Sequence, residues 1–102
     1  MFVTIRIYET PQPKHEIAKF VEERFLPSVT ESPEFRGWYI VDAGEDKLAS
    51  ITLFDRMGAA LEANEKSEAY RTGNDEMGNM LPNAPEIVVG KVMRWAMPET
   101  QD

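Results

Sequence analysis

A chain of 102 residues, with 42% hydrophobic and 28% charged residues, has the size and composition of one globular domain built around one core. Its 18 acidic and 11 basic residues give a formal charge of −7, which disfavours nucleic acid and anionic membrane surfaces as partners. The sequence has no cysteine, which excludes disulfides, thiolate nucleophiles and cysteine-ligated metal clusters.

The first residues predict a β-strand. Aliphatic residues at positions 3, 5 and 7 alternate with polar or mixed residues at 4, 6 and 8. The start of the chain lacks the basic residues and apolar run of a signal peptide, and no stretch approaches the roughly 20 apolar residues of a membrane span. We therefore expect a cytoplasmic protein that does not contact a membrane.

The next segment predicts an amphipathic helix. Pro11 and Pro13 end the strand and suit the first turn of a helix. Apolar residues then recur at helical spacing up to Pro27, the expected end. His15, which is the only histidine, falls in the first turn of this helix. We interpret it as an exposed side chain, because one histidine among scattered carboxylates lacks the spacing of a metal site.

Two β-prone runs predict a hairpin in the middle of the chain. They are Trp38–Ala43 and Lys47–Phe54, and the turn between them is at residues 44–46. Trp38 and Tyr39 must point to opposite faces of the sheet, so the register decides which of the two enters a cavity. We choose Trp38.

Asp55 predicts the N-cap of a second helix, which runs to about Tyr70 or Arg71. Asn64 falls on the apolar face of this helix, where an amide must find hydrogen-bond partners. It either caps a neighbouring backbone group or points into a pocket at a ligand carbonyl. The expected face consists of Met57, Ala60, Leu61 and Asn64.

The C-terminal third predicts a loop and a last strand. Residues 73–85 are rich in Gly, Asn and Pro, with one apolar turn around the methionines, and residues 87–95 predict the strand. The C-terminal residues 98–102 are polar and have nothing to bury in a core. We therefore expect a single domain over residues 1–97 and a flexible tail over residues 98–102.

The order of these elements predicts an α+β domain of the ferredoxin-like plan, β-α-β-β-α-β, with an antiparallel sheet and both helices on one face. We expect the aliphatic side of the strands to meet the helices, in a core through Ile5, Phe20, Phe25, Ile51 and Leu61. The other side would carry Thr4, Arg6, Tyr8, Leu48, Ser50, Thr52 and Phe54. Such a mixed face predicts a homodimer that encloses a partly polar cavity.

Four segments carry a resemblance that spans nearly the whole chain: Pro33–Tyr39, Val41–Gly44, Ser50–Asp55 and Glu62–Asn64. Together they resemble the antibiotic-biosynthesis-monooxygenase-like family of dimeric α+β barrels. The resemblance implies two sheets that close into a barrel across a dimer, with a pocket in each subunit between the open face of the sheet and the second helix. Members of that family range from cofactor-free oxygenases of polycyclic quinols to haem-degrading enzymes.

Four residues are the candidates to line this pocket: Arg6, Trp38, Thr52 and Asn64. Arg6 either binds an anionic substrate or an enolate, or pairs with a carboxylate across the dimer. The hydroxyls at positions 50 and 52 lack a histidine base in the pattern, which argues against a nucleophilic hydrolase.

The leading hypothesis is a small-ligand pocket protein that acts as a cofactor-independent monooxygenase of an aromatic or quinol-like substrate. The alternative is a non-catalytic dimeric module that binds a metabolite or another molecule. A haem-binding protein is the third reading, and the position of His15 outside the element that holds the family's haem ligand argues against it. We expect no cofactor and no metal, and as partners a second copy and a small aromatic ligand.

Overall fold

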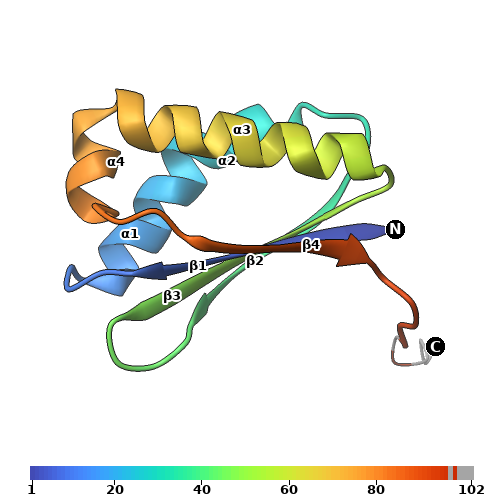
Figure 1. The fold of residues 1–102 in the computed structure, drawn as a ribbon, viewed down its shortest axis with the longest axis horizontal. Coiled ribbons are helices and arrows are strands. Elements are labelled where there is room, and N and C mark those ends of the chain that lie inside the picture. Colours follow the sequence, from blue (N-terminus) through green and yellow to red (C-terminus); the bar gives the residue numbers. More distant parts are fainter. Residues whose placement is uncertain (97, 99–102) are drawn as a thin grey trace.

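A four-stranded antiparallel sheet carries the helices on one of its faces in the computed structural model, which describes residues 1–96 and 98 (Figure 1). The strand order in the sheet is β2-β3-β1-β4, so the first and last strands of the chain lie side by side within it. This is the predicted ferredoxin-like α+β plan. The strands are β1 (Phe2–Glu9), β2 (Phe35–Asp42), β3 (Lys47–Phe54) and β4 (Glu86–Lys91).

The first helical region is longer than predicted. Helix α1 (Lys14–Phe20) leads directly into a π-helical segment, η1 (Val21–Phe25), and then into α2 (Leu26–Thr30). Pro27 does not end the helix, because it lies in the first turn of α2, where the missing N–H is tolerated. The buried side chains of this region are Ile17, Phe20, Val21, Phe25 and Val29.

The second helical region consists of α3 (Met57–Gly73) and α4 (Asp75–Met80). Asp55 is not the N-cap of α3, since that position belongs to Arg56 and Asp55 instead pairs with Arg36. Helix α4 is the apolar turn expected between residues 73 and 85. Asn74 caps it by accepting a hydrogen bond from the Met77 N–H at 2.9 Å.

The predicted orientation of the sheet is wrong. In β1 the buried side chains are Thr4, Arg6 and Tyr8, whereas the aliphatic residues between them are only partly buried. The polar side faces the helices, where hydrogen bonds offset part of the cost of burying its groups. Strand β3 follows the same alternation, since Thr4 pairs with Thr52 and Arg6 with Ser50.

The predicted core is corrected accordingly. Phe20 and Phe25 are buried, but Ile5 and Ile51 lie on the face away from the helices, and Leu61 is 49% exposed. Helix α3 meets the sheet through a different set of mostly small side chains, which allow the helix to approach closely. They are Ala59, Ala60, Ala63 and Ser67.

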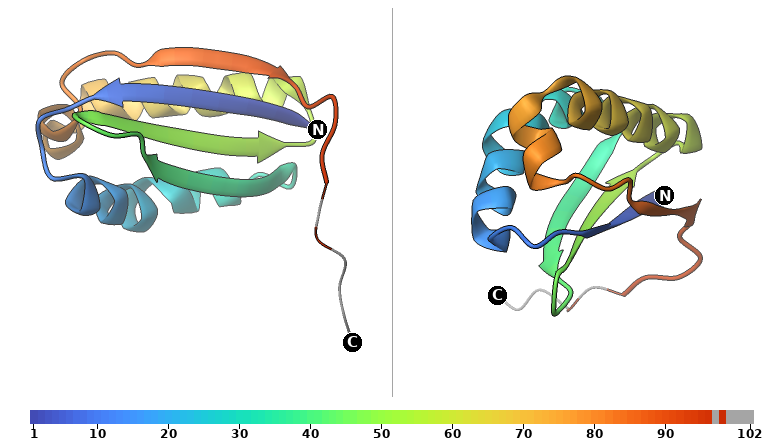
Figure 2. Two further views of the ribbon diagram at one scale, coloured as in Figure 1. Left: turned by 90° about the horizontal axis from the view of Figure 1, so that it is seen from below. Right: turned by 60° about the vertical axis from the view of Figure 1, so that its left-hand side comes forward.

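The face of the sheet opposite the helices, here called the open face, is strongly apolar. Figure 2 shows this face uncovered, with the helices behind it. Tyr39 is 61% exposed and Val41 is 40% exposed on this face. The strand register adds Val3, Ile5, Ile7, Ile51, Leu53 and Val88.

The last strand ends earlier than predicted, at Lys91. Beyond it Met93 and Trp95 are exposed on a segment that leaves the body of the domain (Figure 1). The expected tail over residues 98–102, apart from residue 98, lies outside the described residues. Among the helices that the structure describes, none is long and apolar enough to cross a membrane.

Candidate functional site

A group of hydrogen-bonded polar side chains lies between the sheet and α3. Its centre is Arg6, which sits in the middle of β1 and is 4% exposed. β1 is an inner strand, so its neighbours β3 and β4 and the helix above it exclude water from the guanidinium. We call this group the Arg6 cluster, and its members are Thr4, Arg6, Trp38, Ser50, Thr52 and Asn64.

Asn64 joins this group from helix α3. Its Oδ1 accepts a hydrogen bond from Thr4 Oγ1 at 2.8 Å and a second from Arg6 Nη1 at 3.1 Å. The amide therefore binds two strand side chains, rather than capping a neighbouring backbone group. Asn64 thus lies in the interior beside Arg6.

Ser50 joins the cluster from β3. Arg6 Nη2 donates to Ser50 Oγ at 3.4 Å, and Trp38 Nε1 donates to the same oxygen at 3.3 Å. Arg6 Nε, by contrast, is buried and has no hydrogen-bond partner among the described residues. A buried donor without a partner is costly and is rare in folded proteins.

The structure brings all four predicted site residues to one side of the sheet. Thr52 is buried and lies opposite both Thr4 and Trp38 in the strand register. Trp38 rather than Tyr39 is on the side of Arg6. That side faces the helices, so the expectation that these residues lie on the face away from the helices is wrong. Of the four, Arg6 alone is among the residues that line the cavity beside it. A second copy packed on the open face would be separated from Arg6 by the sheet, so a carboxylate placed there would not reach the guanidinium.

A narrow cavity adjoins Arg6, with a volume of about 20 Å³. Its polar wall includes Tyr8 and Ser67, whose hydroxyl oxygens lie 3.3 Å apart. The π-helical segment η1 supplies Val21 and Phe25 to the opposite wall, and π-helical turns are common at functional sites. The remaining lining residues are Arg6, Ile40, Leu48, Ser50, Met77 and Leu81.

Sequence reasoning missed Tyr8, Ser50 and Ser67 as site residues. Tyr8 and Ser50 follow from the strand register once Arg6 is placed toward the helices. Ser67 lies three positions after Asn64, so both fall on one face of α3. The spacing of Asn64 and Ser67 along the helix was therefore the sequence signal that could have identified Ser67.

Burial lowers the pKa of Arg6, and the interactions with Tyr8 oppose this shift. An arginine side chain nevertheless keeps its proton in proteins. The site therefore holds a positive charge that is shielded from water.

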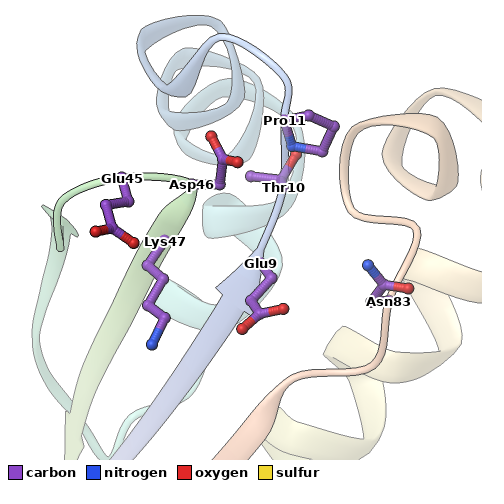
Figure 3. Close-up of a pocket in the computed structure, with 7 residues that line it drawn as sticks. All are labelled: Glu9, Thr10, Pro11, Glu45, Asp46, Lys47 and Asn83. Atoms are coloured by element: carbon purple, nitrogen blue, oxygen red, sulfur yellow. The ribbon is translucent and has the colours of Figure 1, made fainter.

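A larger surface hollow lies elsewhere, at the end of the sheet near the turn between β2 and β3 (Figure 3). It has a volume of about 410 Å³. Most of the side chains that line it are exposed, and its buried residue, Thr10, is satisfied by bonds to Met80 O and from the Gln12 N–H. The lining residues are Glu9, Thr10, Pro11, Glu45, Asp46, Lys47 and Asn83. We do not assign a function to this hollow, because no unpaired buried group among the described residues points into it.

His15 is exposed on α1, as expected. It lines a separate surface hollow with Lys14, Ala18 and Asp42. Within the part of the chain that the structure describes, no three His, Cys, Asp or Glu side chains are grouped so that they could hold a metal ion.

Neither a family model nor a curated protein matches the sequence. Solved structures do share the fold. A protein of unknown function from Nitrosomonas europaea, NE2512, has a TM-score of 0.72 at 14% identity, over 97% of this chain and 95% of that chain. The monooxygenase from the gene ActVA-Orf6 of Streptomyces coelicolor, in complex with Nanaomycin D, has a TM-score of 0.72 at 14% identity, over 96% of this chain and 92% of that chain.

A third similar structure is a mutant of MhuD with two manganese protoporphyrin IX molecules bound per active site. Its TM-score is 0.70 at 18% identity, over 96% of this chain and 100% of that chain. The chain thus has the ferredoxin-like α+β fold that the resemblance to antibiotic-biosynthesis-monooxygenase-like proteins implied. At identities this low the likeness establishes the fold, and one fold serves many activities.

Proposed function

We propose that this protein is a small-ligand pocket protein that binds an oxygen-bearing aromatic molecule at the Arg6 cluster and acts on it as a cofactor-independent monooxygenase. The observation that carries the proposal is the buried guanidinium of Arg6 with its unpartnered Nε beside a cavity. The similarity to a monooxygenase structure supports the choice of reaction.

The proposed chemistry uses the substrate as the source of electrons. A phenol that has lost its proton can reduce O2, and one oxygen atom then enters the ring as a carbonyl while the other leaves as water with two hydrogens of the substrate. Arg6 would stabilise the negative oxygen of the phenolate, since a fixed cation in a dry site stabilises developing charge strongly. Asn64 and Ser50 would hold Arg6 in place, and Trp38 would sense the ligand through Ser50, a residue of the cavity wall to which it donates a hydrogen bond.

The size of the cavity restricts the substrate. A volume of about 20 Å³ holds roughly one water molecule. A ligand must therefore displace side chains at the wall, and Met77 is suited to this because methionine is unbranched and adaptable. A substrate with one ring is favoured over a polycyclic one.

We also propose that the protein is a homodimer in the cytoplasm. The apolar open face supports the dimer, because soluble monomers rarely leave a large contiguous apolar surface uncovered. In this arrangement the dimer forms on one side of the sheet and the ligand binds on the other.

Two measurements on the purified protein test the proposal. Trp38 fluorescence should be quenched in a saturable way by single-ring quinols and aromatic acids, and O2 should be consumed with the quinols. Trp95 is exposed and would add background, so both measurements use a Trp95→Phe chain. Asn64→Ala removes the acceptor that holds Arg6 Nη1 in place and should therefore weaken binding. Absence of both quenching and O2 uptake across a broad set of compounds would contradict the proposal.

The second candidate is a non-catalytic module that binds a metabolite. It is favoured by the make-up of the cavity wall, whose lining residues include neither a histidine nor a carboxylate that could take the proton of a phenol. Saturable quenching without O2 uptake supports this candidate. Haem binding would give an absorption band on titration with haem, and the exposed position of His15 on α1 does not favour it.

A further inference from the structure

The charge of Arg6 has no counterion among the described residues. Its hydrogen-bond partners, Asn64 and Ser50, are both neutral. The ion pairs of the structure involve other arginines and Lys14. A buried charge without a partner is strongly unfavourable, so an arginine in such a place calls for an anion.

The acidic groups of the surrounding elements do not supply this anion. On α3, Glu62, Glu65 and Glu68 are all exposed, and Glu62 and Glu68 lie within ion-pair distance of Arg56 and Arg71 respectively. On β4, Glu86 is exposed and shares the open face with Ile7. The counterion must therefore come from outside the described chain, through the cavity.

The residues that line the cavity beside Arg6 are of two chemical kinds. Arg6, Tyr8, Ser50 and Ser67 bring hydrogen-bonding groups to its wall, whereas the other lining residues are aliphatic, aromatic or methionine. The planar guanidinium, with Nε free, matches a planar oxyanion that can accept two parallel N–H bonds. A ligand that contacts both kinds of residue carries a negative charge on one part and a small apolar body on another.

We infer that the natural ligand of this site is a small organic monoanion whose carboxylate or phenolate oxygen neutralises Arg6 and whose apolar body lies among Val21, Phe25 and Met77. This inference names the class of ligand that binds at the proposed site. It rests on the proposed function for the location of the site and does not depend on the reaction with O2. A carboxylate and a phenolate provide the same negative oxygen, and ligand pairs distinguish them.

The test compares matched ligands by thermal unfolding and by calorimetric titration of the full chain. Benzoate is compared with benzamide, which has the same shape but no charge, and 4-nitrophenol is titrated above and below its own pKa. Benzoate or 4-nitrophenolate should bind at least tenfold more tightly than its neutral counterpart. At 100 times its Kd, the ligand should raise the midpoint of unfolding by on the order of 10 °C. Whichever of the two anions binds identifies the source of the charge.

Three variants assign the effect to Arg6. Asn64→Asp places a carboxylate where Oδ1 now contacts Arg6 Nη1, so it should lower the affinity for the anion at least tenfold. Arg6→Gln should do the same and remove the preference over the neutral ligand. Lys66→Gln is the matched control, because Lys66 is an exposed cation on α3 and its loss should leave the affinity unchanged within twofold.

The outcomes separate this inference from the proposed function. Tight binding of the anion without O2 uptake supports the inference and removes the monooxygenase. Equal affinities for charged and neutral ligands, or an anion affinity that Asn64→Asp leaves unchanged, would overturn the inference even if O2 is consumed. Should Arg6→Gln fail to fold, the ligand pairs on the unchanged protein still decide the question.

Discussion

Arg6 Nη1 and Asn64 Oδ1 lie 3.1 Å apart although the two residues are 58 positions apart in the chain. The contact joins the first strand to the third helix across the interior. A carboxylate at position 64 would have neutralised the guanidinium, whereas an amide orients it and leaves its charge in place. The pair therefore holds a charge in position for a ligand.

Replacing Asn64 should destabilise the free protein. Asn64→Ala removes the acceptor of both Thr4 and Arg6, and buried donors left without a partner cost about 1 to 3 kcal/mol. Urea unfolding at fixed protein concentration measures the loss. Leu61→Ala, on the exposed side of the same helix, is the control and should cost less than about 0.5 kcal/mol. Equal losses for the two variants would show that the Asn64 contacts contribute little.

The chain should form a homodimer through the open face. Two copies are expected to bury on the order of 1,600 Å² or more in total. Light scattering after size exclusion should give twice the 11.6 kDa of the chain. Val41→Lys places a charge on this face and should shift the equilibrium to the monomer, whereas Leu61→Lys, on the helical side, should not. A monomer for the unchanged chain at micromolar concentration would rule out the dimer.

Phe54 is the residue at which the packing of the core can be tested. This side chain is 1% exposed and packs edge to face against Phe35, with ring centroids 6.2 Å apart. Phe54→Ala should therefore lose about 3 to 5 kcal/mol of unfolding free energy. Chemical denaturation measures it, and a loss below about 1 kcal/mol would mean that the site collapses around the missing ring.

Stability should fall in acid through two exposed carboxylates. The hydrogen bond from Arg56 lowers the pKa of Glu34, and the hydrogen bond from Arg71 lowers the pKa of Glu68. Because both folded pKa values lie below the unfolded value of about 4.3, this contribution is present above that pH and is lost as the pH falls through the folded pKa values.

Thermal unfolding from about pH 7 to about pH 3 measures this dependence. Glu34→Gln should reduce the fall in the midpoint over the acidic part of the range, because it removes one of the titrating groups. The effect should be small and should weaken in high salt, since the pair is exposed. A midpoint that rises on acidification would contradict the sign.

The sequence was sufficient to predict the fold but not the direction in which the sheet faces. Alternation of apolar and polar residues in β1 identifies a strand, yet it leaves open which side meets the helices. The expectation that the aliphatic side is buried failed because Thr4 Oγ1 and Arg6 Nη1 both donate to Asn64, which lies about sixty positions away. Local pattern carries no information about such a partner.

The site residues were predicted more successfully than their surroundings. Arg6, Trp38 and Thr52 were grouped because the strand alternation puts them on one face of the sheet, and Asn64 because it falls on the apolar face of the second helix. They lie near one another on the helix side of the sheet, but only Arg6 among them lines the cavity beside it. The side-chain spacing of a strand is two, so choosing the wrong face moved the whole group together.

The π-helical segment has a consequence for how the first helix meets the core. Ile17, Val21, Phe25 and Val29 are all buried and recur at intervals of four residues. In an α-helix of 3.6 residues per turn each such interval turns about 40° too far, so three of them would carry Val29 about 120° around the axis from Ile17. The wider turn of η1 rotates less per residue and winds part of this angle back. This single π-helical turn thus keeps the side chains at every fourth position directed at the core from α1 to α2.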